Sequence, residues 1–122
     1  MSVLPAHLRR GAAAEELAHG FLEARGLRPV ARNFRTPHGE LDLIMRDGDA
    51  VVFVEVRYRA TRRFGLAQQT VGARKQSHLI AAAQHWLQDH PREARRPCRF
   101  DVVAMHGEHG GSIEWLKNAF PA

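Results

Sequence analysis

The sequence predicts a single α/β domain, in which a mixed β-sheet is flanked by two helices in the chain order αβββαββ. Two kinds of periodicity support this fold class. Apolar residues recur every three or four positions over residues 12–25 and 73–89, as expected of amphipathic helices. They alternate with polar residues over residues 40–45 and 51–58, as expected of half-buried strands. The chain has 122 residues, the length of one ordinary domain, so we expect residues 1–122 to form one unit.

The first helix is expected over residues 12–25, with Gly26 as its stop signal. On a helical wheel, Glu15 lies at the edge of the apolar stripe and Glu16 lies nearly opposite it. We therefore expect Glu16 to be solvated and Glu15 to border the buried face. The stripe itself consists of Ala14, Leu17, Ala18, Phe21 and Leu22.

A short strand at residues 30–34 and a turn at residues 36–39 precede a β-hairpin. The dipeptide Asp47-Gly48 favours a two-residue type I′ turn between the hairpin strands. With these two residues as the loop, Asp42 pairs with Phe53. The two-residue period of a strand then assigns the side chains to two faces. One face carries Glu40, Asp42, Glu55 and Arg57, and the other carries Leu41, Leu43, Val52, Val54 and Val56.

The second half of the chain is expected to add a helix at residues 73–89, a fully buried strand at residues 100–105 and a final strand at residues 112–116. The helix would be the crossover between the two strands on either side of it. Its apolar face consists of Leu79, Ile80, Ala83, Trp86 and Leu87.

The charged face of the hairpin is a candidate metal site. Asp42 and Glu55 would be diagonal neighbours, with side-chain origins up to about 7–8 Å apart. That gap suits a shared Mg²⁺, which keeps several waters and needs few protein ligands. Such an ion polarises a phosphodiester, and Arg57 on the same face would meet the charge that develops on phosphorus. Spacing alone leaves two other readings open: a solvated hairpin face, and an ion pair with Arg57 or Arg59 that needs no metal.

The charge balance favours a polyanionic partner. The formal net charge is +5, and only Lys75 and Lys117 among the 18 basic residues are lysines. A basic surface attracts nucleic acid, although an excess of arginine also arises from composition bias alone. The single cysteine, Cys98, excludes a disulfide framework, and no apolar stretch reaches the length of a membrane span. We expect a soluble cytoplasmic protein without a membrane partner.

Several runs carry a family resemblance, and together they extend over residues 11–120. The runs are Ala14-Glu15-Glu16-Leu17-Ala18, Arg32-Asn33-Phe34-Arg35, Gly39-Glu40-Leu41-Asp42-Leu43-Ile44, Val51-Val52-Phe53-Val54-Glu55-Val56-Arg57-Tyr58-Arg59, Phe64-Gly65, Lys75, Arg99-Phe100-Asp101-Val102-Val103 and Asn118-Ala119-Phe120. In this order and spacing the chain resembles the YraN-like family of predicted endonucleases. That family is similar to archaeal Holliday-junction resolvases and is placed in the PD-(D/E)XK nuclease superfamily, whose restriction-endonuclease-like core has the order αβββαβ.

The resemblance implies roles for individual residues. Asp42 matches the metal-binding aspartate, Glu55 matches the acidic residue of the E-X-K element, and Glu15 matches the helix glutamate that completes the acidic site. Glu40 belongs to the Gly-Glu-X-Asp run and is an accessory candidate. The superfamily expects lysine where this chain has Arg57. Since arginine does not deprotonate in proteins, a role for Arg57 as general base is excluded, and water positioning and charge stabilisation remain.

The function implied by the resemblance is hydrolysis of phosphodiester bonds in branched or single-stranded DNA, as in recombination and repair, with Mg²⁺ or Mn²⁺ as cofactor. Symmetric cleavage of a junction by a domain with one site would require a homodimer. Two alternatives remain open: a nucleic-acid-binding module on the same fold that has lost catalysis, which Arg57 motivates, and an interaction protein with a purely structural acidic patch. The basic side chains expected to follow the DNA backbone are Arg59, Arg62, Arg63 and Lys75.

Overall fold

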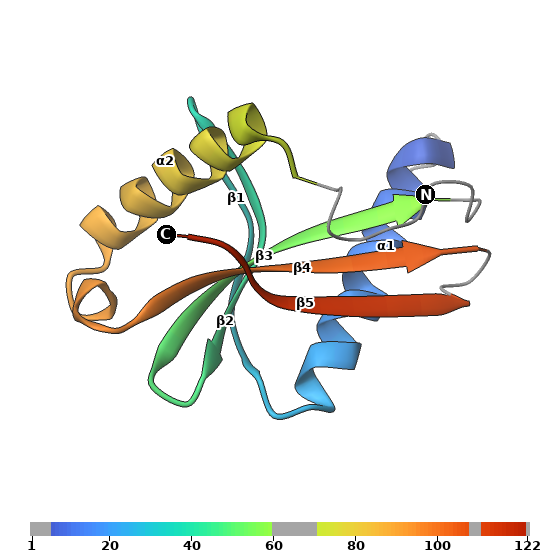
Figure 1. The fold of residues 1–122 in the computed structure, drawn as a ribbon, viewed down its shortest axis with the longest axis horizontal. Helices are drawn as coiled ribbons and strands as arrows, with labels where there is room; N and C mark the ends of the chain where they lie inside the picture. Colours follow the sequence, from blue (N-terminus) through green and yellow to red (C-terminus); the bar gives the residue numbers. More distant parts are fainter. Residues whose placement is uncertain (1–5, 60–70, 108–110, 122) are drawn as a thin grey trace, which may run out of the picture.

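A computed structural model describes residues 6–59, 71–107 and 111–121 of the chain. It contains two helices, a short 3₁₀ helix at Glu93–Arg95 and five strands (Figure 1). The elements in chain order are α1 (Ala6–Glu23), β1 (Arg28–Thr36), β2 (Gly39–Asp47), β3 (Ala50–Arg59), α2 (Ala73–Asp89), β4 (Cys98–His106) and β5 (Ser112–Phe120). This order confirms the predicted αβββαββ arrangement, with β5 reaching four residues further than expected.

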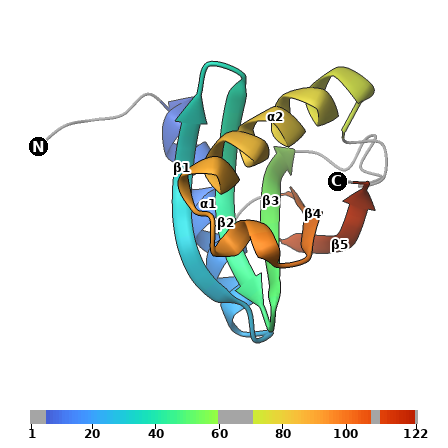
Figure 2. The same cartoon turned by 90° about the vertical axis from the view of Figure 1, so that its left-hand side faces the viewer.

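The five strands form one mixed sheet in the order β1-β2-β3-β4-β5. Neighbouring strands are antiparallel except β3 and β4, which are parallel and are joined through α2. Helix α1 covers one face of the sheet and α2 covers the other (Figures 1 and 2). The predicted sheet flanked by helices, with the second helix as the crossover, is confirmed. Neither of the two helices in the described parts of the chain is long and apolar enough to cross a membrane.

Two apolar layers hold the helices to the sheet. The layer under α1 is formed by Ala14, Ala18, Leu22, Leu27, Leu43, Met45, Val52, Val54, Val103 and Met105. The layer under α2 is formed by Leu41, Ile44, Val51, Phe53, Leu79, Ala82, Ala83, Trp86, Phe100 and Phe120. β4 contributes side chains to both layers, so it is buried on both faces, as predicted. Leu17, expected in the stripe of α1, is instead 44% exposed, because the buried face of this helix is the narrower line of Ala14, Ala18 and Leu22.

The loop of the β2–β3 hairpin differs from the prediction by one position. Asp47 pairs with Ala50, so the loop is Gly48-Asp49 and not Asp47-Gly48. Gly48 has a φ of 59°, whereas Asp49 is not among the residues with positive φ, so the predicted type I′ turn is also wrong. The expected and the observed registers differ by two residues on one strand and place the same side chains on the same faces. Both registers satisfy the apolar pattern, so the pattern does not distinguish between them.

The observed register changes which residue of β3 lies nearest to Asp42 of β2. Pairing of β2 with β3 runs from Asp47–Ala50 to Leu43–Val54 and stops before Asp42. Continued by one step, this register would bring Asp42 opposite Glu55 and not diagonal to it. Beyond Leu43, β2 pairs only with β1. There the two-residue period fails as well, because Leu41 packs in the layer under α2 and not with Leu43 under α1. The hairpin thus opens at the point where its carboxylates begin.

Candidate functional site

Asp42 lies where β2 separates from β3. Its Oδ2 atom accepts a hydrogen bond of 2.8 Å from the backbone N–H of Val56. This side chain therefore satisfies a strand donor of β3 in the region where the β2–β3 backbone pairing has ended. The Asp42 side chain thus supplies the acceptor for Val56 where the main-chain ladder ends.

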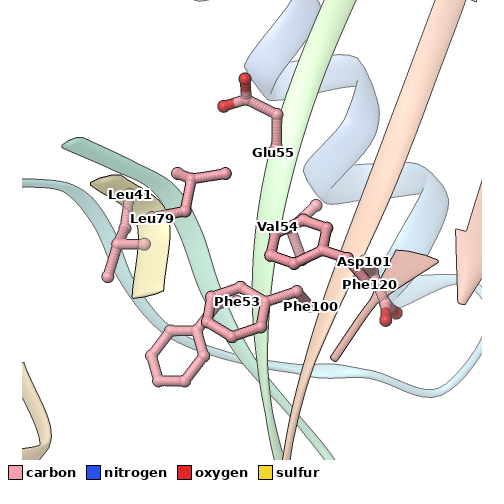
Figure 3. A pocket seen from close by; sticks show the side chains of 8 residues that line it. All are labelled: Leu41, Phe53, Val54, Glu55, Leu79, Phe100, Asp101 and Phe120. Atoms are coloured by element: carbon pink, nitrogen blue, oxygen red, sulfur yellow. The ribbon is translucent and has the colours of Figure 1, made fainter. Parts of the chain in front are cut away.

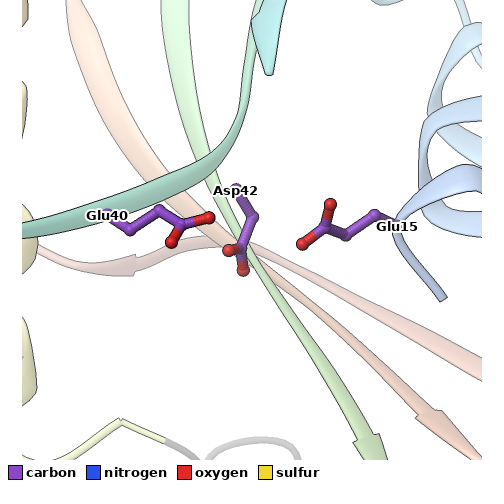
Figure 4. Close-up of side chains that lie close together, drawn as sticks. All are labelled: Glu15, Glu40 and Asp42. Atoms are coloured by element: carbon purple, nitrogen blue, oxygen red, sulfur yellow. The ribbon is translucent and has the colours of Figure 1, made fainter. Parts of the chain in front are cut away.

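Glu15 and Glu40 converge on Asp42 from two different elements. Glu15 comes from α1 and Glu40 from the start of β2, and Figure 4 shows all three carboxylates directed toward one another, with Asp42 in the middle. One oxygen from each of the three lies within 4.8 Å of the others, and all three residues are half-buried. The prediction that Glu15 borders the buried face of α1 agrees with this position, and Glu16 is exposed as expected.

Glu55 stands beside this group and faces two cations. It is 7% exposed, and its Oε2 atom lies 3.4 Å from Lys75 Nζ and 3.7 Å from Arg57 Nε. Lys75 belongs to the first turn of α2, so this cation arrives from a different element than Arg57. Figure 3 shows the carboxylate of Glu55 directed away from an apolar hollow that has no room for a water molecule. The hollow is lined mainly by Leu41, Phe53, Leu79, Phe100 and Phe120.

Burial and like charges alter the acidity of this site. Burial, followed by the negative charge of Glu55, raises the pKa of Asp42 to about 8, while the hydrogen bond from Val56 opposes the shift. The pKa of Glu15 is also raised, first by burial and then by the charges of Glu40 and Glu55, and is held down by a hydrogen bond from Asn33. Without a cation, the Asp42–Glu55 pair therefore favours keeping a proton, because burying two ionised carboxylates side by side is costly.

Asn33 is a site residue that the sequence reasoning missed as such. With its amide nitrogen turned toward its acceptors, it donates to Glu15 Oε1 at 3.0 Å and to Glu40 Oε1 at 3.1 Å. Its φ of 53° is in the left-handed region, which asparagine tolerates better than most residues. An asparagine inside a short predicted strand is the signal that could have drawn attention to it, because asparagine is depleted in strands.

Three of the carboxylates share one arrangement of their oxygens. In each, one oxygen is engaged by a backbone or amide donor or by a cation, and the other, called open here, meets no such donor or cation among the residues that the structure describes. The carboxyls of Asp42 and Glu55 also lie within hydrogen-bond reach of each other. The open oxygens are Glu15 Oε2, Asp42 Oδ1 and Glu55 Oε1. Glu40 differs, because its Oε1 accepts from Asn33 and its Oε2 lies 3.3 Å from Arg35 Nε.

The structure thus brings together the predicted residues Glu15, Glu40, Asp42, Glu55 and Arg57. Lys75, predicted to follow a nucleic-acid backbone, joins them through Glu55. Arg62 and Arg63 lie outside the described residues, and of Arg59 only the place at the end of β3 is described.

Arg99 and Asp101 belong to a separate group of paired polar side chains. Arg99 Nη1 lies 2.9 Å from Asp47, and Arg99 Nε donates to Asp101 at 3.0 Å. Asp101 is fully buried and also accepts hydrogen bonds from Trp115 Nε1 and from the backbone N–H of Asn118. These contacts tie the hairpin loop, β4 and β5 together.

Comparison with known proteins gives a family match and close relatives. A family model described as "Uncharacterised protein family UPF0102" matches residues 14–105. A UPF0102 protein of Pseudomonas putida (strain GB-1) is 52% identical over 114 residues, covering 92% of this chain and 93% of that protein. A UPF0102 protein of Nitrosococcus oceani is 50% identical over 115 residues, covering 93% of both.

Among solved structures, the chain is similar to one titled "The structure of Pyrococcus Furiosus SfsA in complex with Ca2+". The identity is 18% and the TM-score is 0.39, with 94% of this chain covered. This chain spans 64% of the SfsA chain.

Proposed function

The chain belongs to the uncharacterised protein family UPF0102, and on that premise we propose that it is a metal-dependent endonuclease that hydrolyses phosphodiester bonds in DNA. The observation that carries the proposal is the set of open oxygens on Glu15, Asp42 and Glu55. Three carboxylates from three elements each keep one oxygen engaged and one open, an arrangement that a solvated acidic surface does not require.

The donor set fits a hard divalent cation. Carboxylate oxygens are the ligands that Mg²⁺ and Mn²⁺ prefer, and Mg²⁺ keeps several waters, so a few carboxylates are sufficient. The pKa of Asp42, raised by burial and then by the charge of Glu55, supports the same assignment, because a bound cation would offset both effects. Glu15, Asp42 and Glu55 would hold the ion, and Glu40, whose oxygens are both engaged, would stay outside its coordination shell.

When bound, the ion supplies a Lewis acid that polarises a phosphodiester and makes a bound water more acidic. The protein's own cations act beside it. The side chain of Arg57 is 21% exposed, and because arginine does not serve as a proton donor or acceptor in proteins, its role would be to hold Glu55 and stabilise negative charge. Lys75 is 47% exposed in its side chain and has a flexible stem, so its ammonium can reach a phosphate while remaining near Glu55.

The substrate class follows from charge and site. The net charge of +5 favours a polyanion, and two cations beside an acidic cluster suit a phosphodiester backbone. Branched or single-stranded DNA is the proposed substrate, and symmetric cleavage of a junction would require a homodimer.

The experiment compares Asp42→Ala and Glu55→Ala with the wild type, using Mn²⁺ and junction, flap, single-stranded and duplex DNA. Each variant should lose cleavage while DNA binding stays within a few-fold, because the carboxylates hold the ion and the basic side chains hold the backbone. Glu16→Ala is the matched control, since Glu16 adjoins Glu15 on α1 but is exposed and pairs with Arg32. Cleavage that survives both substitutions would refute the assignment.

Arg57 supports a second candidate function, a DNA-binding module of the same fold without catalysis. In that case the wild type binds Mn²⁺ and DNA but cleaves none of the four substrates. Calorimetric titration with Mn²⁺ separates both functions from a structural acidic patch, which would take up no cation.

A further inference from the structure

Glu15 is the carboxylate of the site that most needs to be held. It is the only one of Glu15, Asp42 and Glu55 on a helix, whereas the other two belong to neighbouring strands of the sheet. Its side chain is half-buried and faces the charges of Glu40 and Glu55, which repel it. A long, flexible side chain in this position would turn toward solvent unless a hydrogen bond retained it.

Asn33 is the hydrogen-bond donor that the structure shows for Glu15. It lies on β1 between the register pairs Arg32–Leu43 and Phe34–Leu41, which places it beside Asp42 on the neighbouring strand. Its two amide protons match two acceptors, Glu15 Oε1 at 3.0 Å and Glu40 Oε1 at 3.1 Å. The left-handed backbone at φ 53° interrupts the regular alternation of β1, so this residue is not oriented by the strand pattern alone.

Glu40 completes the arrangement from the other side. Its Oε2 atom lies 3.3 Å from Arg35 Nε, and its Oε1 atom accepts from Asn33. Glu40 therefore orients the amide of Asn33, and Arg35 offsets the charge of Glu40. Glu40 therefore has both oxygens engaged, although an oxygen of it lies within 4.8 Å of oxygens of Asp42 and Glu15.

We propose that Asn33 is a positioning residue for the cation site, and that its amide, oriented by Glu40, holds Glu15 so that its second oxygen stays available beside Asp42. The inference rests on the proposed function in one respect only, namely the identity of the site as a cation site. The contact between Asn33 and Glu15 can be tested without any cation.

The first experiment follows the side-chain amide signals of Asn33 by ¹⁵N NMR in the cation-free protein. Glu15→Ala should shift both amide proton signals and speed their exchange with water, because one acceptor is lost. Glu16→Ala, one residue along the same helix, should leave them unchanged. Asn33 signals that do not respond to Glu15→Ala overturn the proposal, whether or not the protein binds a cation.

The second experiment measures Mn²⁺ affinity of Asn33→Gly by calorimetry. Glycine accepts the left-handed backbone while the side chain with its amide is removed. Groups that orient metal ligands typically contribute 10- to 100-fold in affinity, so we expect a loss of about that size. Asn118→Gly is the matched control, because Asn118 has the same φ of 53° and its backbone N–H donates to Asp101, which is not one of the proposed ligands.

The outcomes separate the two proposals. Weaker Mn²⁺ binding in Asn33→Gly with unchanged binding in Asn118→Gly supports the positioning role, and equal affinity in Asn33→Gly and the wild type overturns it. A wild type that binds no Mn²⁺ refutes the proposed function, while the NMR experiment still decides whether Asn33 holds Glu15.

Discussion

The ammonium group of Lys75 lies 3.4 Å from Glu55 Oε2, the oxygen that Arg57 Nε also faces at 3.7 Å. Glu55 and Arg57 are two residues apart on β3, whereas Lys75 is delivered by the first turn of α2. β3 has arginine, not lysine, two residues after Glu55. Lys75 of α2 nevertheless contacts Glu55. This relationship distributes the positive charge of the site over two elements and leads to the first prediction.

Lys75→Ala should lower Mn²⁺-dependent cleavage by about 10²-fold, the usual effect of removing one group that stabilises charge in a transition state. Arg57→Lys should preserve or raise the rate, because lysine keeps the charge on a more compact group. Single-turnover cleavage measures both. Lys117→Ala is the control, since the only other lysine lies over the ring of Trp115. A Lys75→Ala rate equal to that of Lys117→Ala would contradict a role for Lys75.

The stability of the cation-free protein should fall as pH rises from about 4 to about 8. The pKa of Asp42 is raised by burial and by Glu55 from 3.8 to about 8, so the folded state binds more protons than the unfolded state over this interval. Stability then decreases with pH, by an amount on the order of a few kcal/mol at about 1.4 kcal/mol per pKa unit. Urea unfolding at several pH values measures it. Asp42→Asn should flatten the profile, and an unchanged profile would contradict the assignment to Asp42.

Mn²⁺ binding near pH 7 should release about one proton, because Asp42 must give up its proton to act as a ligand. Calorimetry in two buffers of different ionisation enthalpy gives the number of protons directly. The released fraction should diminish above pH 8, where Asp42 is already ionised. Binding enthalpies that do not depend on the buffer would speak against a protonated Asp42.

Asp101→Ala should cost about 3 kcal/mol of stability, since it leaves Arg99, the indole N–H of Trp115 and the backbone N–H of Asn118 without their buried acceptor. The midpoint of urea unfolding reports the loss. Asp89→Ala at the end of α2, where the side chain is 62% exposed, should change it little. A stable Asp101→Ala protein would mean that these donors find other acceptors.

DNA binding without a divalent cation should weaken by roughly 10²-fold between 50 and 200 mM salt if about four phosphates are contacted. Lys75→Ala should reduce the slope of log affinity against log salt by about one. Fluorescence anisotropy over a salt series measures both. An affinity that stays flat over this range would remove nucleic acid from the partners of this protein.

The elements and the faces of the hairpin from Leu43 to Val56 could be predicted from the sequence, because both depend on local periodicity, whereas the face of Leu41 could not. A period of 3.6 or of 2 determines which side chains share a face, whatever they later contact. Asp42, Glu55 and Arg57 were therefore found together, and Glu15 was placed at the edge of its helix face. The position of the hairpin loop could not be predicted, because two registers that differ by two residues satisfy the same apolar pattern.

Only the tertiary structure decided which elements meet at the carboxylates. Lys75 reaches Glu55 because α2 crosses over from β3 and begins beside it, and no spacing in the chain encodes that contact. Asn33 joins Glu15 to Glu40 through a left-handed backbone that interrupts β1, and the opening around Asp42 exists because β2 leaves β3 after Leu43. Periodic patterns record which side of an element is buried, whereas the packing of α1, α2 and the sheet determines which polar groups meet.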